Sequence, residues 1–497
     1  RMNRWLFRAG ATGFILGGAY EYDRYRYGSG LFRTIRTLGV GLIVTLDYKI
    51  NFREGSSQQE LDRIHDRCAN LILDTCRKNG GLYIKFGQAI AMQSAVMPPQ
   101  YAIFRQLYDD APAVPFKDIE QVFSEDFGCH PDALFDDFER VPIASASIAQ
   151  VHCAKIKGTN EKVAVKVQKL AIRKQLEWDL MAQEWTSRAL SWAFDLPLAW
   201  STEFTSQRLR EEVDFIKEGR NSVEAARGIA AESRLRYRAY VPQVHWQLTA
   251  PRVLTAEFID GVRLTDPEGI DRAGFSKAEI METLVDVFAH QIFVGGTVHC
   301  DPHPGNVIVR VNPKQAPLLD RLFGTLLTPF AWLGLASNRL SDIQLVILDH
   351  GLYLHCSDSF RRQYAHLWRA MFTRDMTTLE HICKSWGIED YTLFASATLM
   401  RPFTNSPREA DRVSAPLHER VSGGIRMPTY VKTEEDVYAM HMRTKQRARK
   451  FLEHSERIPP EIVFIGRNMN IIRALNKMMG SPVNRIRIMG DWAVRAI

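Results

Sequence analysis

Apolar side chains recur every three or four residues between positions 58 and 110, and this spacing predicts helices. A turn with the sequence Asn-Gly-Gly at 79–81 is expected to end the first helix. A second helix is expected from Leu82 to Met97, where two consecutive prolines end it. The recurring positions of the first helix are Leu61, Ile64, Cys68, Leu71, Ile72 and Thr75.

The spacing changes to an alternation of two between residues 134 and 168, which predicts β-strands. Strands are expected over 151–156 and 163–167, with a hairpin turn between them. The later elements are expected to be helices over 170–235, a strand over 251–258, and mainly helices from 277, with short strands over 306–310 and 344–348. A small β-rich region followed by a larger helical one is the order of the two lobes of a protein kinase. The expected fold class is therefore α+β and two-lobed.

The first twenty residues contain arginines but no acidic side chain, as at the end of a mitochondrial transit peptide. Residues 9–20 carry no charge, but a full membrane span needs about 20 apolar residues. Two interpretations stay open, a membrane anchor over residues 5–20 or a short helix packed on the body of the protein. The arginines that follow would suit an anionic membrane surface, and they are Arg24, Arg26, Arg33 and Arg36.

The composition is that of a globular protein, with 45% hydrophobic and 24% charged residues among 497. It excludes a disordered chain, a collagen-like chain and a polytopic membrane protein. The net charge of +7 is small for this length; it does not favour a nucleic-acid partner and fits nucleotide phosphates or anionic lipid equally well. The seven cysteines form no C-x-x-C pair and no zinc spacing, which predicts reduced and mostly buried thiols.

Four short segments that carry candidate chemistry occur in a kinase-like order. The first covers 144–151 and precedes a strand, as the glycine-rich loop of a kinase does, although alanine restricts the close backbone approach that glycine permits. The second is Lys166, where V-A-I-K-type motifs place a lysine that holds ATP phosphates. On its own, a lysine on an alternating strand is usually only a solvent-facing side chain. The loop residues are Ala144, Ser145, Ala146, Ser147, Ile148 and Ala149.

The third and fourth segments supply the acidic and amide groups. Asp301 and Asn306 are five residues apart, as in the catalytic loop H-R-D-x-x-x-x-N. The alternative for this segment alone is a proline-rich turn with local side-chain bonds to the backbone. Asp349 follows an apolar strand in Asp-His-Gly, which matches D-F-G with histidine in place of phenylalanine, and it would chelate Mg²⁺. It is the four segments together, in order, that point to a kinase-like site.

From about residue 60 to 480 the chain resembles the UbiB family of atypical kinases, also called aarF-domain-containing kinases, and most of all the branch of aarF-domain-containing kinase one and its fungal relatives. Residues 85–88, Lys-Phe-Gly-Gln, match the K-x-G-Q signature of the family's helical N-terminal extension. Residues 212–214, Glu-Val-Asp, match its E-x-D element, and Glu218 matches its αC-type glutamate. One departure is Ala149, where many members have glycine.

The resemblance implies roles for these residues. Lys166 would pair with Glu218 and the ATP phosphates, Asn306 and Asp349 would bind Mg²⁺, and Asp301 would be the catalytic-loop acid. Backbone groups of Glu257 and Ile259 would contact the adenine edge. Lys85 is expected near Glu212 and Asp214, with Gln88 on the same helical turn. The extension would then cover the protein-substrate site, so protein phosphorylation is not expected.

The expected domains are a targeting remnant with a candidate anchor over 1–55, the helical extension over 56–130, an N-lobe over 131–262 and a C-lobe over 263–497. Asp301 and Asp349 are 48 residues apart, which indicates an insertion at about 312–342. Residues 322–336 carry no charge. We expect residues 318–340 to protrude and dock on lipid or a membrane partner; the alternative is burial against the C-lobe.

The resemblance therefore implies an ATP- and Mg²⁺-dependent ATPase or small-molecule or lipid kinase that supports coenzyme Q or mitochondrial lipid homeostasis. Its expected partners are ATP or ADP, a quinone or other isoprenoid lipid, and a membrane surface, with no nucleic acid. The expected location is mitochondrial and associated with the inner membrane. The alternative is a catalytically silent scaffold that senses nucleotide and organises lipid or membrane partners.

Overall fold

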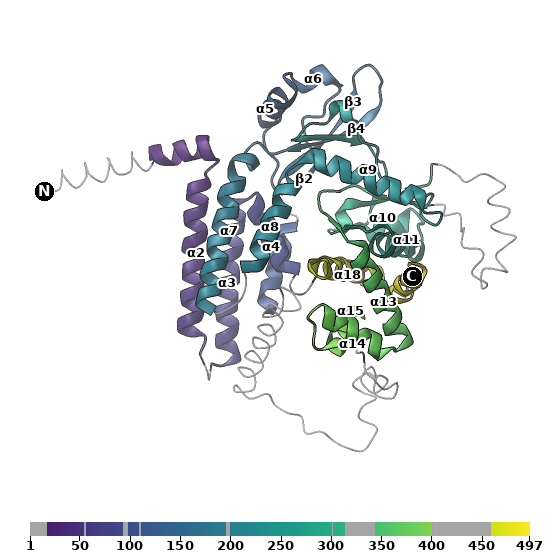
Figure 1. Cartoon of the computed structure of the whole chain (residues 1–497). Helices are drawn as coiled ribbons and strands as arrows, with labels where there is room; N and C mark the ends of the chain where they lie inside the picture. The colour runs from purple at the N-terminus through teal and green to yellow at the C-terminus, as the bar shows by residue number, and fades with distance from the viewer. Residues whose placement is uncertain are drawn as a thin grey trace. The chain divides into compact units, whose positions relative to one another are not determined.

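The computed structural model describes residues 17–53, 56–92, 98–108, 111–194, 199–300, 302–313, 343–399, 403 and 459–497. These residues form two compact units, each described below by itself (Figure 1). The first unit runs to Ile216 and also takes in His245–Thr255. The second begins at Lys217 and contains most of the remaining described chain. Residues 318–340, for which docking on lipid is expected, lie outside the described residues.

Helices dominate the first unit. The predicted end of the first helix is confirmed, because its last residue is Asn79 and Gly80 follows with a φ of 63°. Its start is fixed by Ser57 and Glu60, each of which bonds the backbone N–H of the other. The second predicted helix is described from Leu82 to Met92. The helices of this unit are α2 (Gly30–Asn51), α3 (Gln58–Asn79), α4 (Leu82–Met92), η1 (Pro99–Tyr108), α5 (Phe116–Phe127), α6 (Pro131–Leu134), α7 (Ile172–Phe194) and α8 (Ala199–Glu212).

Helix α2 lies along α3 and α7, as Figure 1 shows. The expectation that Arg33 faces an anionic membrane is wrong, because its side chain is only 4% exposed. Its guanidinium bonds both carboxylate oxygens of Asp179 on α7, at 3.0 and 2.5 Å, and also donates to the carbonyl oxygen of Asn79. Burial raises the pKa of Asp179 to about 6 despite this partner. Arg33 therefore joins three helices of the bundle.

Residues Gly17–Tyr27 form a helix before α2, and the chain bends by 107° between the two. The carboxylate of Asp23 accepts the backbone N–H groups of Leu31 and Phe32, both at 3.1 Å, and so caps the start of α2. In the described ranges no single helix is long and apolar enough to cross a membrane; this bent pair reaches that threshold only when its two helices are taken together.

A five-stranded sheet completes the first unit, in the order β1-β3-β4-β6 with β2 paired to β3. Val163, Val165 and Val167 of β4 are buried against α5, while Lys166 lies on the other face of the strand. The two predicted strands at 151–156 and 163–167 are confirmed, because alternation of this kind marks a half-buried strand. The bounds are β1 (Phe135–Asp136), β2 (Ala144–Ser145), β3 (Ala149–Ile156), β4 (Lys162–Gln168) and β6 (Val253–Glu257).

The second unit contains a four-stranded sheet, β5-β10-β9-β7, and a two-stranded one, β11-β8. The bounds are β5 (Ala239–Tyr240), β7 (Val262–Arg263), β8 (Thr297–His299), β9 (Val307–Val311), β10 (Ile343–Ile347) and β11 (Tyr353–His355). Strands β9 and β10 lie within one residue of their predicted positions. They are antiparallel, and their first pair is Val311 with Ile343, so residues 312–342 join two neighbouring strands.

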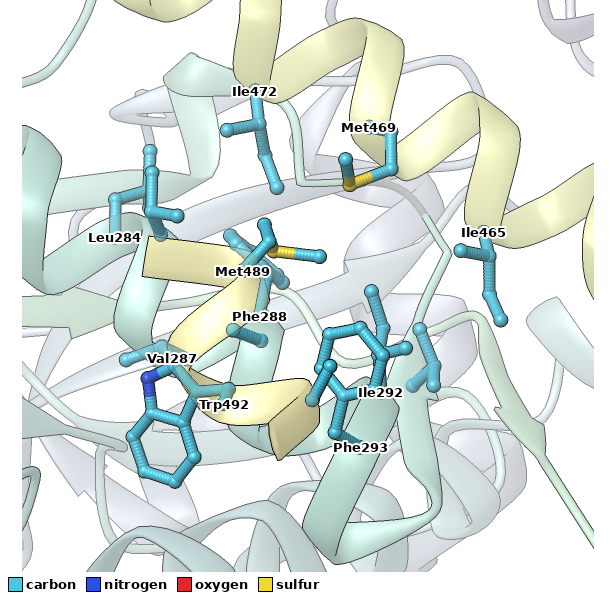
Figure 2. Close-up of a cluster of buried hydrophobic side chains, with 14 of the residues drawn as sticks. Leu284, Val287, Phe288, Ile292, Phe293, Ile465, Met469, Ile472, Met489 and Trp492 are labelled. Atoms are coloured by element: carbon cyan, nitrogen blue, oxygen red, sulfur yellow. The ribbon is translucent and has the colours of Figure 1, made fainter. Parts of the chain in front are cut away.

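The helices of the second unit surround one apolar core. They are α9 (Phe215–Ala231), α10 (Pro267–Arg272), α11 (Lys277–His290), α13 (Asp358–Thr373), α14 (Met376–Ser385), α15 (Tyr391–Leu399), α18 (Pro460–Met478) and α19 (Arg485–Arg495). The one-turn helix η2 (Trp246–Leu248) belongs to the first unit. Figure 2 shows side chains of α11, α18 and α19 meeting in this core, among them Leu284, Phe288, Met469, Ile472, Met489 and Trp492. Trp492 also donates its ring N–H to Asp286 at 2.9 Å. Helices before and around small sheets confirm the expected α+β class.

Candidate functional site

Lys166 lies in the first unit at the centre of the β3–β4 hairpin, paired in register with Val151. The alternation of β4 turns its side chain away from the buried valines. Its ammonium lies 5.1 Å from the centre of the Phe215 ring, which is fully buried. A cation over an aromatic face is held by the negative face of the ring. Lys166 thus has a fixed position before any ligand arrives.

The alanine-rich loop is a closed hairpin. Ala144 and Ser145 pair with Val151 and Gln150, and the N–H of Ala146 donates to the Ala149 carbonyl at 2.8 Å. No residue from 144 to 149 has a positive φ. Glycine is therefore not required for this backbone, which explains how alanine is accommodated at position 149. At the tip, Ser147 and Ile148 are buried.

The K-x-G-Q segment lies on α4, and the predicted contact of its lysine is present. Lys85 forms an ion pair with the carboxylate of Glu212 at the end of α8. Asp214, the other acidic residue of the E-x-D element, is exposed and accepts the N–H of Ile216 at 3.1 Å. It therefore caps the first turn of α9.

The glycine and glutamine of the same segment hold η1. A Cβ at Gly87 would come within 2.1 Å of Leu107 Cδ1, so a larger residue here would force the Leu107 side chain or η1 to shift. Gln88 donates its side-chain N–H to the Leu107 carbonyl at 2.9 Å. Sequence reasoning placed Gln88 beside Lys85 and did not predict this bond.

Asn306 and Asp349 are brought together within the second unit. Asn306 ends the one-turn helix η4 (Pro304–Asn306), and Asp349 follows β10. The side-chain N–H of Asn306 donates to Asp349 Oδ2 at 3.3 Å, and the Asn306 carbonyl accepts the N–H of Leu348 at 2.9 Å. Asp349 Oδ1 accepts the N–H of Gly351 at 2.9 Å. Residues 43 positions apart thus meet at one end of the β9–β10 pair.

The donor set of Asn306 and Asp349 suits Mg²⁺. Carboxylate and amide oxygens are ligands that this ion takes together with waters and phosphate oxygens. In the described ranges no group of three or more His, Cys, Asp and Glu side chains is placed to hold a metal ion. Waters and phosphate oxygens would complete a site of one carboxylate and one amide.

His350 stands where D-F-G has phenylalanine, and it is buried. Its Nε2 lies 3.1 Å from the Ile347 carbonyl, so this nitrogen carries the proton and donates. Its Nδ1 then accepts the Tyr353 hydroxyl at 2.8 Å. Burial raises the pKa of Tyr353 well above its usual value, which keeps that hydroxyl protonated. Asn221 donates to the His350 carbonyl at 3.0 Å, so three hydrogen bonds of His350 hold the turn after Asp349.

Asp301 lies outside the described residues, but the strand that leads to it is well anchored. Helix α11 continues as a π-helical turn, η3 (Gln291–Gly295), before β8. Gln291 accepts the N–H of His299 at 3.0 Å, and Asn468 donates to the His299 carbonyl at 2.8 Å. Single π-helical turns often mark functional sites. This one fixes the chain two residues before Asp301.

The expected adenine-contacting segment begins at Glu257, the last residue of β6, and belongs to the second unit. The N–H of Glu257 already donates to the Gln243 carbonyl at 2.9 Å, so its carbonyl is the backbone group that adenine could use. The Glu257 side chain accepts the Tyr240 hydroxyl at 2.5 Å, and burial raises the pKa of Tyr240 to about 12. Ile259 is buried. Contact of Glu257 and Ile259 with adenine stays a prediction.

Glu218 lies on α9 in the second unit and is 2% exposed, whereas Lys166 belongs to the first unit. Their pairing stays a prediction. Sequence reasoning missed Lys169, a buried lysine beside the alanine-rich loop. No pattern in the sequence marks it, because a lysine at the end of a strand is normally exposed.

Comparison with known proteins identifies the family. Residues 106–383 match the ABC1 atypical kinase-like domain. The chain belongs to this family. An ABC1 family protein lscO from Purpureocillium lilacinum is 36% identical over 97% of this chain and 80% of its own length. ABC1 family protein C10F6.14c from Schizosaccharomyces pombe is 35% identical over 99% of this chain and 83% of its own.

A further ABC1 relative, AarF domain-containing protein kinase 1 from Xenopus laevis, is 29% identical over 98% of this chain and 86% of its own. The resemblance to the UbiB and aarF-domain kinases is therefore confirmed. A solved structure, the Rv3197–erythromycin complex from Mycobacterium tuberculosis, covers 85% of this chain and 98% of its own, at 19% identity and a TM-score of 0.43. At that score the likeness carries no argument about this chain.

Proposed function

We propose that this ABC1-family chain binds Mg·ATP and acts as an ATPase or as a kinase of a small molecule or lipid. The observation that carries the proposal is the meeting of Asn306 and Asp349, whose side chains touch at 3.3 Å. This amide and carboxylate pair is the donor set that kinase-like enzymes use to hold the metal of a metal–nucleotide complex.

The roles of the chain's own residues follow from their chemistry. Asn306 and Asp349 would hold Mg²⁺, which neutralises phosphate charge when bound. Lys166 binds phosphate oxygens as a point charge already positioned over Phe215. Asp301 orients the acceptor hydroxyl or water by accepting its proton. Glu257 binds the nucleobase through its backbone carbonyl, and Ile259 through its backbone N–H.

The acceptor we propose is water, a quinone-like molecule or another isoprenoid lipid, and not a peptide. The support is the resemblance of the K-x-G-Q extension to that of the UbiB family, together with the Lys85–Glu212 ion pair that anchors it to α8. The cellular role would be support of coenzyme Q or mitochondrial lipid homeostasis. Cell fractionation with an inner-membrane marker tests the proposed location.

A membrane surface is the proposed partner of α2. Its outward apolar side chains are each between 43% and 60% exposed, and they are Leu31, Ile35, Leu42, Ile43, Leu46 and Ile50. At 1.5 Å per residue this face is about 28 Å long. The exposed charges of α2 are Arg36 and Lys49, because Arg33 is buried and Asp47 pairs with Arg67 at 2.5 Å. An apolar face accompanied by two exposed cations suits an anionic bilayer.

Vesicle sedimentation tests this partner. We expect Leu42→Ser with Leu46→Ser to weaken binding to phosphatidylcholine vesicles that contain phosphatidylserine. The control is Leu393→Ser, an equally exposed leucine at 63% in the second unit. Equal binding by the α2 variant and the control would exclude the α2 face. A deletion of 318–340, in a parallel assay, tests the second proposed membrane element.

Titration of Mg·ATP by calorimetry tests the central proposal. Asp349→Asn should abolish metal-dependent ATP binding and hydrolysis, because it removes the only charged metal ligand of the pair. Asp271→Asn is the matched control, since Asp271 is exposed and pairs only with Lys277 at 2.7 Å. Unchanged Mg·ATP affinity in Asp349→Asn would overturn the nucleotide site.

A nucleotide-sensing scaffold is the second candidate. It is favoured by the closed hairpin of the alanine-rich loop, whose tip residues Ser147 and Ile148 are buried in the protein. A loop of this kind can bind nucleotide without reorganising to transfer a phosphoryl group. Tight Mg·ATP binding without turnover, in the presence and absence of quinone-containing vesicles, would favour the scaffold.

A further inference from the structure

Lys169 follows β4, and its side chain is buried beside the alanine-rich loop, with 9% exposed. Its ammonium donates to the Ala146 carbonyl at 2.6 Å and to the Pro112 carbonyl at 2.8 Å. Its backbone N–H donates to the Ile148 carbonyl at 2.9 Å. One residue therefore holds the loop at two points and joins it to a separate segment of the chain.

That separate segment, residues 111–114, is here called the strap, and Gln150 is its second anchor. The N–H of Val114 donates to Gln150 Oε1 at 2.8 Å, and Gln150 Nε2 donates to the Val114 carbonyl at 3.3 Å. Gln150 is completely buried and lies 3.0 Å from His152 Nε2. His152 Nδ1 donates to the Glu139 carbonyl at 2.7 Å, so its Nε2 is the acceptor for Gln150.

The strap follows η1, the element that the K-x-G-Q segment holds. Gln88 on α4 bonds the Leu107 carbonyl of η1, and Lys85 on the same helix pairs with Glu212. The strap itself begins at Ala111. Polar contacts thus join α4 to η1 and join the strap to the alanine-rich loop, and the strap follows η1 along the chain, all within the first unit.

Burial of the Lys169 ammonium costs free energy, which argues that its contacts contribute to the position of the loop. The acceptors that the structure records for its ammonium are neutral carbonyl oxygens, and burial lowers the pKa of Lys169 to about 8. In a trans peptide the carbonyl and the next N–H point in opposite directions. By binding the Ala146 carbonyl, Lys169 fixes the direction of the Ser147 N–H, the kind of group that nucleotide-covering loops present to phosphates.

We propose that Lys169 is a positioning residue for the alanine-rich loop and that, through the strap, it couples this loop to the K-x-G-Q extension. The inference rests on the proposed nucleotide binding. Nucleotide affinity should then depend on the bonds of Lys169 to Ala146 and Pro112, although Lys169 itself need not touch the nucleotide.

The test compares Lys169→Met with Lys169→Arg by calorimetric titration of Mg·ATP and Mg·ADP. Methionine keeps the length and removes the donor, and a lost charge-assisted hydrogen bond predicts a change of about tenfold in affinity or in the ATP/ADP ratio. Arginine keeps the donors and should stay within about threefold of the wild type. Lys155→Met is the matched control, because Lys155 is an exposed lysine of the same sheet that pairs with Asp137 at 2.8 Å.

Coupling to the extension is measured with a double-mutant cycle of Gln88→Ala and Lys169→Met. We expect the two changes in ATP affinity to be non-additive by about threefold or more, since both act on the same chain of contacts. Additive effects would overturn the coupling. A Lys169→Met affinity and ATP/ADP ratio equal to those of Lys155→Met would overturn the positioning role.

Pro112→Gly serves if Lys169→Met does not fold. Its side chain is exposed, so the change loosens the strap without removing core packing. It should shift nucleotide affinity in the same direction as Lys169→Met and by a smaller factor; no shift would count against the proposal. If the wild type itself binds no nucleotide, the proposed function fails, whereas binding by the wild type with no effect of these variants removes only this inference.

Discussion

The candidate functional residues of the first unit and those of the second unit are held in different ways. In the first unit, Lys169 holds the alanine-rich loop and Gln150 holds the strap, both through hydrogen bonds to backbone groups. In the second unit, Asn306 and Asp349 stand at the ends of β9 and β10, whose inward side chains belong to a large apolar core. Hydrogen bonds depend on a few atoms, whereas a packed core spreads its free energy over many contacts.

This difference predicts different responses to mutation. Single changes among the polar contacts of the first unit should alter ligand binding while the fold survives. Changes beneath the metal-binding pair should act mainly on folding. Four measurements test this difference.

The largest effect is expected for Trp492→Ala in the second unit. It empties a buried site in the core of α11, α18 and α19 and leaves Asp286 without the donor at 2.9 Å. The free energy of unfolding should fall by about 3–5 kcal/mol. Denaturant titration with tryptophan-independent detection measures it. Trp192→Ala, at a position 88% exposed, should cost less than about 0.5 kcal/mol, and equal losses would contradict the account of the core.

Gly87→Ala should have an intermediate effect in the first unit. Its Cβ would lie 2.1 Å from Leu107 Cδ1, so the buried Leu107 side chain or η1 itself must shift. Overpacking of this kind costs about 1–3 kcal/mol. The measurement is thermal unfolding with limited proteolysis of η1. Gly39→Ala on α2 is the control, because no atom lies within 4 Å of the added group, and it should stabilise the helix by about 0.5–1 kcal/mol.

The Lys85–Glu212 ion pair should contribute less. Its side chains are 23% and 13% exposed, so solvent screens the pair in part. A double-mutant cycle of Lys85→Met and Glu212→Gln should give a coupling of about 1 kcal/mol that decreases at high salt. A coupling indistinguishable from zero at low salt would mean that the ion pair does not anchor the extension.

The last prediction concerns a pH dependence from Lys169. Its pKa is about 8 in the folded chain, below the ordinary 10.5. Between these values the folded chain has released the proton and the unfolded chain still holds it, so stability should rise as pH increases from about 8 toward 10.5. The difference in unfolding free energy between wild type and Lys169→Met, followed over this range, isolates this slope. A difference that does not change with pH would mean that the ammonium is well solvated.

Sequence patterns located the elements that alternate or repeat over many residues. The hairpin of β3 and β4, the Asp-His-Gly turn and the helix break at Gly80 were all predicted, because each depends on neighbouring residues. The two- and three-residue strands β1, β2, β5, β7, β8 and β11 are too short to show a period and were not predicted.

Partners that are distant in the sequence explain why the roles of several side chains are not predicted. The sequence predicts Arg33 to be a surface cation because its partner Asp179 lies 146 positions away. The buried role of Lys169 depends on Pro112 and Ala146, and no local pattern contains all three. Nothing in the spacing of Gln88 indicated its bond to Leu107. Side chains whose function is to join distant segments are the ones that a single sequence conceals.

The histidine in the Asp-His-Gly turn bears on inhibitor design. A phenylalanine in D-F-G can leave its pocket for another apolar site, and the packing of this side chain separates active from inactive states of protein kinases. If His350 left its pocket, the Ile347 carbonyl and the Tyr353 hydroxyl would each lose a buried hydrogen bond. Compounds that bind only when this turn has left its pocket should therefore bind this protein weakly. Selective ligands are better sought among molecules that bind the turn in its observed conformation.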